Sequence, residues 1–96
     1  MGGVVRMGDN STSDPCGAPP RPPTSSSPNV YANGKSTVRV GDSWALHSCP
    51  RSHPHGAVSS GGSSSVFVNG KPMVRQGDPI SCGSLANQCS SNVFSG

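Results

Sequence analysis

Residues 28–42 read PNVYANGKSTVRVGD, and residues 64–78 read SSVFVNGKPMVRQGD. The two stretches are identical at eight of fifteen positions. A partial copy opens the chain, where residues 5–9 read VRMGD, and another closes it, where residues 92–96 read NVFSG. Self-similarity of this kind is the sequence signature of a repeated structural unit. The repeat therefore decides how the rest of the chain is interpreted.

The repeat predicts one domain, residues 1–96, made of three circularly cut units. The third unit is split, with its second half at the N-terminus and its first half at the C-terminus. The predicted boundaries are about 1–27 with 92–96, 28–63 and 64–91.

Each complete unit carries an Asn-Gly pair between two short apolar runs. This is the strongest local signal for a β-hairpin, because a type I′ turn needs positive φ at both central residues. The Gly-Asp pair after the second arm is typical of a turn. No window has apolar residues at helical spacing over three turns, so we expect almost no helix. The expected hairpin arms are residues 30–32 with 35–40, and residues 66–68 with 71–76.

Three hairpins with long Gly/Ser/Pro-rich loops cannot each bury a face alone. Packed around a common axis, they can share one narrow core. The predicted fold is therefore all-β, a small pseudo-threefold arrangement of short β-hairpins with long loops.

The composition shows how thin that core must be. Leu, Ile, Val and Phe total 15 of 96 residues, whereas Ser, Gly and Pro total 42. No apolar run approaches the roughly 20 residues that a membrane helix needs. Small domains with so little apolar surface usually need disulfides, a metal ion or a partner surface.

The first residues, Met1 to Arg6, contain no apolar segment of the kind found in signal peptides. We therefore expect synthesis in the cytoplasm without a signal peptide. In a reducing compartment the four cysteines are expected to be metal ligands or free thiols.

Nearly all the side chains that could bind a metal ion lie in the loops that follow the Gly-Asp turns. If the loops converge on the axis, their His and Cys side chains meet there. Such a set suits tetrahedral Zn²⁺, and Fe²⁺ can use similar ligands. The residues are Asp14 and Cys16 in the first loop, His47, Cys49, His53 and His55 in the second, and Cys82 and Cys89 in the third.

In these features the sequence resembles the PAAR-repeat family, the sharpened tip proteins of contractile injection systems. The resemblance rests on the repeat, the three Gly-Asp turns, the His-rich second loop and the Ser-Cys-Gly of residues 81–83. The family's literal tetrapeptide is absent, since the corresponding residues 72–75 read PMVR and residues 36–39 read STVR. The first loop also lacks the histidine that relatives commonly have.

The resemblance implies a cone with a metal-stabilised apex. Carried over residue by residue, it makes His47 and Cys82 the firmest metal ligands, followed by His55. Cys16 is favoured as the fourth ligand because it lies in the matching loop, and His53 or Asp14 are the alternatives. One structural ion is expected, Zn in the first place and Fe in the second.

The resemblance also implies the partner and the task. The base would cap a trimeric β-helical spike, one copy per trimer, and the tip would touch the target outer membrane transiently as it pierces the envelope. The chain would be assembled into a phage virion tail spike or, alternatively, secreted by a type VI system. No enzymatic activity, nucleic-acid partner or small-molecule substrate is expected.

Two other function classes fit the sequence less well. A metal-dependent hydrolase needs an open metal position for water, which four protein ligands would close. A small zinc-stabilised nucleic-acid module needs a basic stripe, and seven Lys and Arg spread over three repeats make a poor one.

Several residues keep two interpretations at this stage. Turn capping is favoured over a carboxylate cluster for the aspartates of the Gly-Asp pairs, and the repeated arginines either contact a partner or form a solvated face. Trp44 either packs in the core or faces the partner. Cys49 and Cys89 are expected to be free or packed thiols, with metal ligation as the alternative and a disulfide between them as a further one. The aspartates are Asp9, Asp42 and Asp78, and the arginines are Arg6, Arg39 and Arg75.

Overall fold

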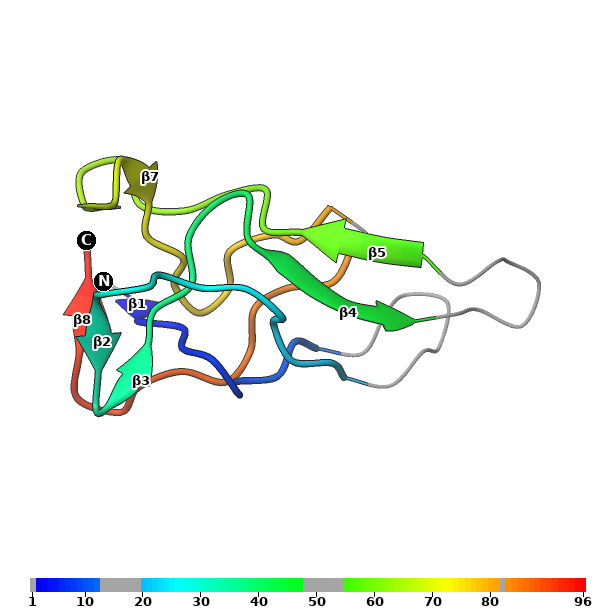
Figure 1. The fold of residues 1–96 in the computed structure, drawn as a ribbon, viewed down its shortest axis with the longest axis horizontal. Helices are drawn as coiled ribbons and strands as arrows, with labels where there is room; N and C mark the ends of the chain where they lie inside the picture. Colours follow the sequence, from blue (N-terminus) through cyan, green and yellow to red (C-terminus); the bar gives the residue numbers. More distant parts are fainter. Residues whose placement is uncertain (1, 13–19, 48–54, 82) are drawn as a thin grey trace.

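A computed structural model describes residues 2–12, 20–47, 55–81 and 83–96. These residues form short strands and no helix, in a body whose principal extents are 37 × 24 × 22 Å (Figure 1). In the described part of the chain, no helix is long and apolar enough to cross a membrane. The strands are β1 (Gly2–Gly3), β2 (Tyr31–Ala32), β3 (Lys35–Ser36), β4 (Ser43–His47), β5 (His55–Val58), β6 (Phe67–Val68), β7 (Lys71–Pro72) and β8 (Phe94–Ser95).

The two Asn-Gly pairs form the expected tight turns. β2 pairs with β3, and β6 pairs with β7, both antiparallel. Asn33 and Gly34 have φ of 56° and 77°, and Asn69 and Gly70 have φ of 53° and 79°. Positive φ at both central residues is the requirement of a type I′ turn.

The third hairpin is assembled from the two ends of the chain. β1 pairs antiparallel with β8, with Gly2 opposite Ser95 and Gly3 opposite Phe94. All three hairpins lie at the same end of the molecule (left in Figure 1).

A closed ring of backbone hydrogen bonds joins the three repeats. The Val5 N–H donates to the Val74 carbonyl (3.1 Å), Val74 donates to Val38 (3.0 Å), and Val38 donates back to Val5 (3.0 Å). All three side chains have 0% exposure. The ring is therefore the point at which the three units meet around one pseudo-threefold axis.

The backbone contacts around this ring follow the same symmetry. Arg6 forms an isolated bridge with Thr37, Arg39 with Met73, and Arg75 with Val4, so each repeat pairs with the next. The predicted pseudo-threefold, all-β fold of short hairpins is confirmed.

The apolar core is divided between two small clusters. One surrounds the hydrogen-bonded ring of Val5, Val38 and Val74, which we call the valine ring. It extends toward β4 and β5 and includes Trp44, Ala57 and Ile80. The other lies beneath the hairpins and consists of Val4, Ala32, Val68 and Met73.

One element was not expected from the repeat. The repeat predicts a loop after the Gly-Asp turn, with residues 47–56 as its His-rich part, but residues 43–47 and 55–58 form the paired strands β4 and β5, with a register irregularity between Trp44 and His47. Trp44 and Ala57 are Cα partners, and both are buried against the first cluster. Their burial explains why this segment is ordered as a hairpin.

We predict that Val38→Ala lowers the free energy of unfolding by about 2 kcal/mol, because it leaves a cavity at the fully buried axis. Denaturant unfolding measures the loss. The matched control is Val66→Ala in the same type of repeat, since Val66 is 36% exposed and should cost less than about 0.5 kcal/mol. If both variants lowered the free energy of unfolding equally, the buried axis would not be the stabilising centre of the fold.

Candidate functional site

The first loop starts and ends beside other loop segments. Thr12, its last described residue before position 20, donates its N–H to the Leu85 carbonyl (2.8 Å), and the Leu85 N–H donates to Thr12 Oγ1 (3.0 Å). On the return side, the Ser11 N–H donates to the Arg21 carbonyl (2.8 Å). Both stems of this loop are therefore held against each other and against the segment after position 82.

The second loop starts and ends on the paired strands β4 and β5. His47 and His55 are Cα partners in this pair, directly opposite each other in register. Two further contacts tie the hairpin to the other loops. The Ala45 N–H donates to the Pro22 carbonyl (2.9 Å), and Ser81 N–H donates to the Val58 carbonyl (2.9 Å).

The stems of all three loops thus gather at the end of the molecule opposite the short hairpins (right in Figure 1). This arrangement brings the backbones of His47 and His55 together. Their side chains are not described, and Asp14, Cys16, Cys49, His53 and Cys82 lie outside the described residues. Within the described ranges, no three His, Cys, Asp or Glu side chains form a group that could hold a metal ion.

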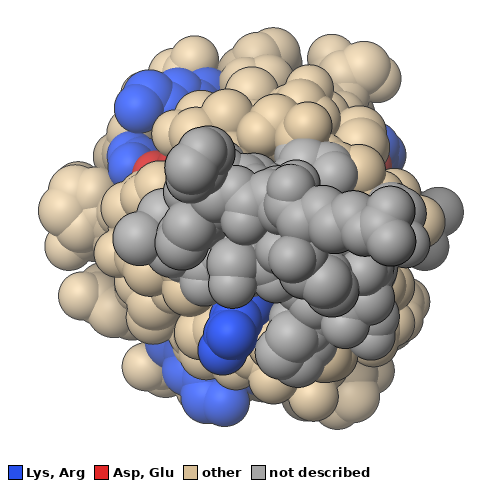
Figure 2. All heavy atoms as spheres, turned by 90° about the vertical axis from the view of Figure 1, so that its right-hand side faces the viewer, with Lys and Arg blue, Asp and Glu red and all other residues tan. Residues whose placement is uncertain are grey.

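Figure 2 views the molecule from this end. Among the described residues, Lys and Arg side chains form separate groups on this face, most of them near its edge and one near its lower centre, and no continuous basic stripe is visible there. Such a distribution differs from the clustered basic face that marks a nucleic-acid footprint.

The Arg and Asp of each V-R-x-G-D motif form the same ion pair in every repeat. Arg6 Nε lies 2.9 Å from Asp9 Oδ2, Arg39 Nη2 lies 2.9 Å from Asp42 Oδ1, and Arg75 Nη2 lies 3.0 Å from Asp78 Oδ1. Each carboxylate also accepts the backbone N–H of its own arginine, at 2.7 to 2.8 Å. The expected turn-capping role of the aspartates is confirmed.

The guanidinium groups reach beyond their own repeat. Arg6 Nη1 donates to Asn33 Oδ1 (3.1 Å), and Arg39 Nη1 donates to Asn69 Oδ1 (3.2 Å). These asparagines are the first residues of the two Asn-Gly turns. The arginines therefore bind the hairpin tip of a neighbouring repeat, a role that was missed in the sequence although their equivalent positions were recognised.

A buried serine in each repeat reinforces the same contact. Ser27 Oγ donates to Asn69 Oδ1 (2.7 Å), Ser90 Oγ donates to Asn33 Oδ1 (2.5 Å), and Ser63 Oγ donates to the Gly96 carbonyl. Each serine lies three residues before the valine that precedes a hairpin, and accepts that valine's N–H. We call these serine, asparagine and arginine contacts the inter-repeat latches.

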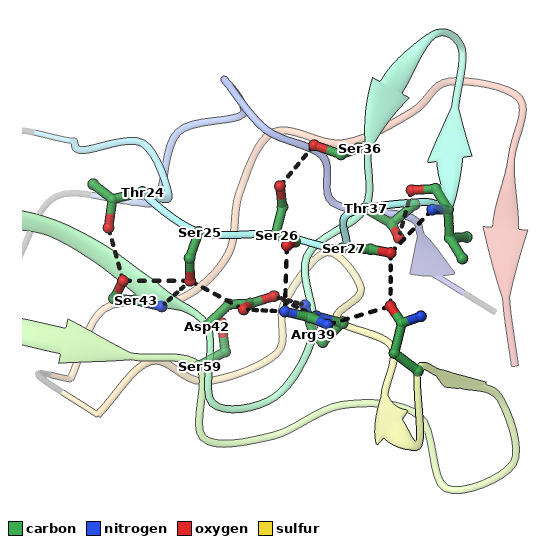
Figure 3. A network of polar contacts seen from close by, with 12 residues as sticks. Thr24, Ser25, Ser26, Ser27, Ser36, Thr37, Arg39, Asp42, Ser43 and Ser59 are labelled. Carbon is green, nitrogen blue, oxygen red and sulfur yellow. Dashed lines mark hydrogen bonds and ion pairs between the residues drawn. The ribbon is translucent and has the colours of Figure 1, made fainter.

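The Asp42 carboxylate belongs to an extended polar network (Figure 3). It accepts hydrogen bonds from Arg39 and from Ser25 Oγ (3.0 Å), and Ser25 Oγ in turn accepts the Ser43 N–H (2.9 Å). The network joins the strand β4 to the segment that returns from the first loop. It therefore anchors the bases of two loops at once.

Burial alone would raise the pKa of Asp42, but the hydrogen bonds from Arg39 and Ser25 together outweigh it and lower the pKa. The side-chain hydrogen bond to the partner aspartate raises the pKa of each arginine, Arg6, Arg39 and Arg75. The Arg39–Asp42 pair is therefore favoured in its charged form at neutral pH.

The structure places Trp44 and Cys89, whose roles the sequence left open. Trp44 is 4% exposed and donates its indole N–H to Ser59 Oγ (2.8 Å), so it is a core residue. Cys89 is half-buried, has no disulfide partner among the described residues, and packs against Gly3, where a side-chain Cβ would come within 2.4 Å of its sulfur. This close approach requires glycine at position 3.

The architecture is that of a small pseudo-symmetric domain, with three hairpins at one end and three loop stems at the other. Comparison with known protein families gives a match to the PAAR motif over residues 2–86. A search of the curated proteins found no match. The protein belongs to the PAAR-motif family, whose members are structural spike tips of contractile injection systems and cap spike proteins.

We predict that Asp42→Ala lowers the free energy of unfolding by about 3 kcal/mol, because it leaves the nearly buried Arg39 without its partner. The side chain of Asp42 is 4% exposed, whereas those of Asp78 and Arg75 are 12% and 26% exposed. Asp78→Ala should therefore cost less, about 1 kcal/mol. Denaturant unfolding of both variants at pH 7 measures the difference, and a larger loss for Asp78→Ala would contradict this ranking.

The Arg39–Asp42 pair makes the free energy of unfolding depend on pH. Because the pKa of Asp42 is lower in the folded than in the unfolded protein, its contribution is complete above the unfolded pKa, near 4, and is lost as the pH falls through the folded value. The stability difference between wild type and Asp42→Ala should therefore shrink below about pH 4.

Proposed function

We propose that this protein is a metal-stabilised piercing tip that caps a trimeric β-helical spike. The observation that carries the proposal is the separation of two ends along one pseudo-threefold axis. The short hairpins form one end, and the stems of all three His- and Cys-bearing loops gather at the other (Figure 1). The hairpin end is the base of the cone, and the loop end is its apex.

The proposed apex holds one structural ion, Zn²⁺ in the first place and Fe²⁺ in the second. His47 and His55 are opposed in an antiparallel pair, in which Cβ atoms are typically about 4.5–5.5 Å apart, a spacing that two ligands of one ion can span. Cys82 follows Ser81, which is hydrogen-bonded to β5. Cys16 is the proposed fourth ligand, with His53 or Asp14 as alternatives.

The metal would add to the stability that a small apolar core provides. The two apolar clusters lie around the axis, where the first extends to β4 and β5, and beneath the hairpins. Structural Zn²⁺ sites contribute on the order of 10–16 kcal/mol to folding in zinc-finger peptides. One ion would thus join the three loops.

The body of the molecule is suited to carrying load. The valine ring and the inter-repeat latches connect every repeat to its neighbours by hydrogen bonds of backbone and buried side chains. Force applied along the axis is therefore shared among three equivalent units. This supports a mechanical role, in which the tip opens the target outer membrane transiently.

The proposed setting is the tail spike of a phage virion or, alternatively, a type VI secretion system. One copy would sit on each spike trimer, after synthesis in the cytoplasm. A monomer with pseudo-threefold symmetry can present equivalent contacts to all three chains of a trimer.

We predict about one Zn or Fe per chain in purified protein, measured by elemental analysis. His47→Ala and Cys82→Ser should each abolish the metal and reduce the free energy of unfolding by several kcal/mol, because the loops lose their common ligand. His53→Ala is the matched control in the same loop as His47, and should retain the metal with a smaller loss. Full stability of metal-free wild-type protein would contradict the proposed site.

We also predict that co-expression with a trimeric β-helical spike gives a complex with one copy of this chain per trimer. Sedimentation or light scattering measures the mass of that complex. A ratio of three copies per trimer would contradict the axial cap.

A further inference from the structure

Three aromatic side chains project from equivalent positions of the three short hairpins. Tyr31 in β2, Phe67 in β6 and Phe94 in β8 are 61%, 57% and 53% exposed. The next residue in each strand, Ala32, Val68 or Ser95, is at most 5% exposed. Since successive strand residues point to opposite faces, the aromatic rings lie on the faces turned away from the core.

These rings are unusual for this chain. It has only four aromatic residues, Trp44 among them, and the other three are the ones exposed on the hairpins. Single exposed apolar residues on a protein surface are ordinary and carry no argument. Nearly equal exposure at three symmetry-related positions is a regular feature, which we call the aromatic triad.

The triad lies on the hairpin end, away from the loop stems (Figure 1). Lys35 and Lys71 are exposed beside the turns of two of these hairpins, and Gly2 occupies the corresponding place in the third. No carboxylate of Asp9, Asp42 or Asp78 is free there, because all three are paired with arginines. The charged side chains described on the hairpins are therefore basic, and they stand beside exposed aromatic rings and neutral polar residues such as Asn33 and Asn69.

We propose that the aromatic triad is the contact surface for the end of a homotrimeric protein, with one ring of the triad seated on each of its three chains. This inference rests on the proposed capping function and identifies the residues that perform it. The matching surface would present three equivalent apolar sockets around a threefold axis, each with an acidic group beside it, and two of these groups would face Lys35 and Lys71.

The symmetry selects this partner over other occupants. A true threefold axis lets all three aromatic rings make the same contact at once, so the binding free energies of the three contacts add. A second copy of this chain would pair about a twofold axis, which cannot treat three rings alike. Aromatic residues in well-packed pockets are the side chains that most often dominate binding energy.

The test is a titration of the trimeric β-helical spike of the same injection system with wild-type protein and with variants. Wild type should bind with one copy per trimer. Tyr31→Ser, Phe67→Ser and Phe94→Ser should each weaken binding about tenfold, and the triple variant should weaken it by at least about 100-fold. Because the three side chains are exposed, the melting temperature should change little.

Leu85→Ser is the matched control, since Leu85 is an exposed apolar residue, 44% exposed, next to the loop stems. Its affinity should stay within about twofold of wild type. If wild type binds and the triple variant binds as tightly, the triad proposal is overturned while capping stands. If one of the three single variants weakens binding as much as the triple variant does, the threefold contact is overturned.

The remaining outcomes separate the two proposals. Failure of wild-type protein to bind the trimer contradicts the capping function itself. Self-association of the wild type that disappears in the triple variant assigns the triad to a second copy of this chain, and overturns its assignment to the trimer.

Discussion

The ring of hydrogen bonds among Val5, Val38 and Val74 is the constraint on which the rest of the structure depends. Each repeat donates one axial N–H and accepts one, so no repeat can satisfy its backbone alone. Buried backbone groups without partners are costly, and this arrangement pairs them only when all three units are in place. A chain with very little apolar surface thereby gains a cooperative centre. The hairpins at one end and the loop stems at the other are both positioned by that centre.

Polar side chains add to the stability that the small apolar core provides. The Arg–Asp pairs fix each Gly-Asp turn, and the inter-repeat latches bind each hairpin tip to the next unit. Hydrogen bonds that involve charged groups are stronger than neutral ones. In this protein such side-chain contacts hold the repeats together beside a small apolar core. The family match and the geometry agree on a spike tip, and the metal and the trimer contact are proposals that build on them.

Much of the fold could be predicted from the sequence because its signals are local and repeated. The Asn-Gly pairs require a specific turn, and the split repeat required β1 to meet β8. The strands β4 and β5 could not be predicted from the repeat, because they depend on the burial of Trp44 and Ala57 against a core formed by distant residues. The latches were missed for the same reason. Arg39 and Asn69 are thirty positions apart, and nothing in either neighbourhood indicates that they touch. Of the candidate ligands, only the opposition of His47 and His55 in the backbone register is described.

The hairpin formed by β1 and β8 has a consequence for how the molecule reaches its final shape. Gly2 and Ser95 stand nearly at opposite ends of the polypeptide, yet they are direct partners in register. The entropic cost of bringing chain segments together grows with the length between them, and distant pairings slow folding. The other two short hairpins close over only a few residues. The pairing of β1 with β8 is therefore expected to be the slow, final event, after the two local turns have formed the other two hairpins.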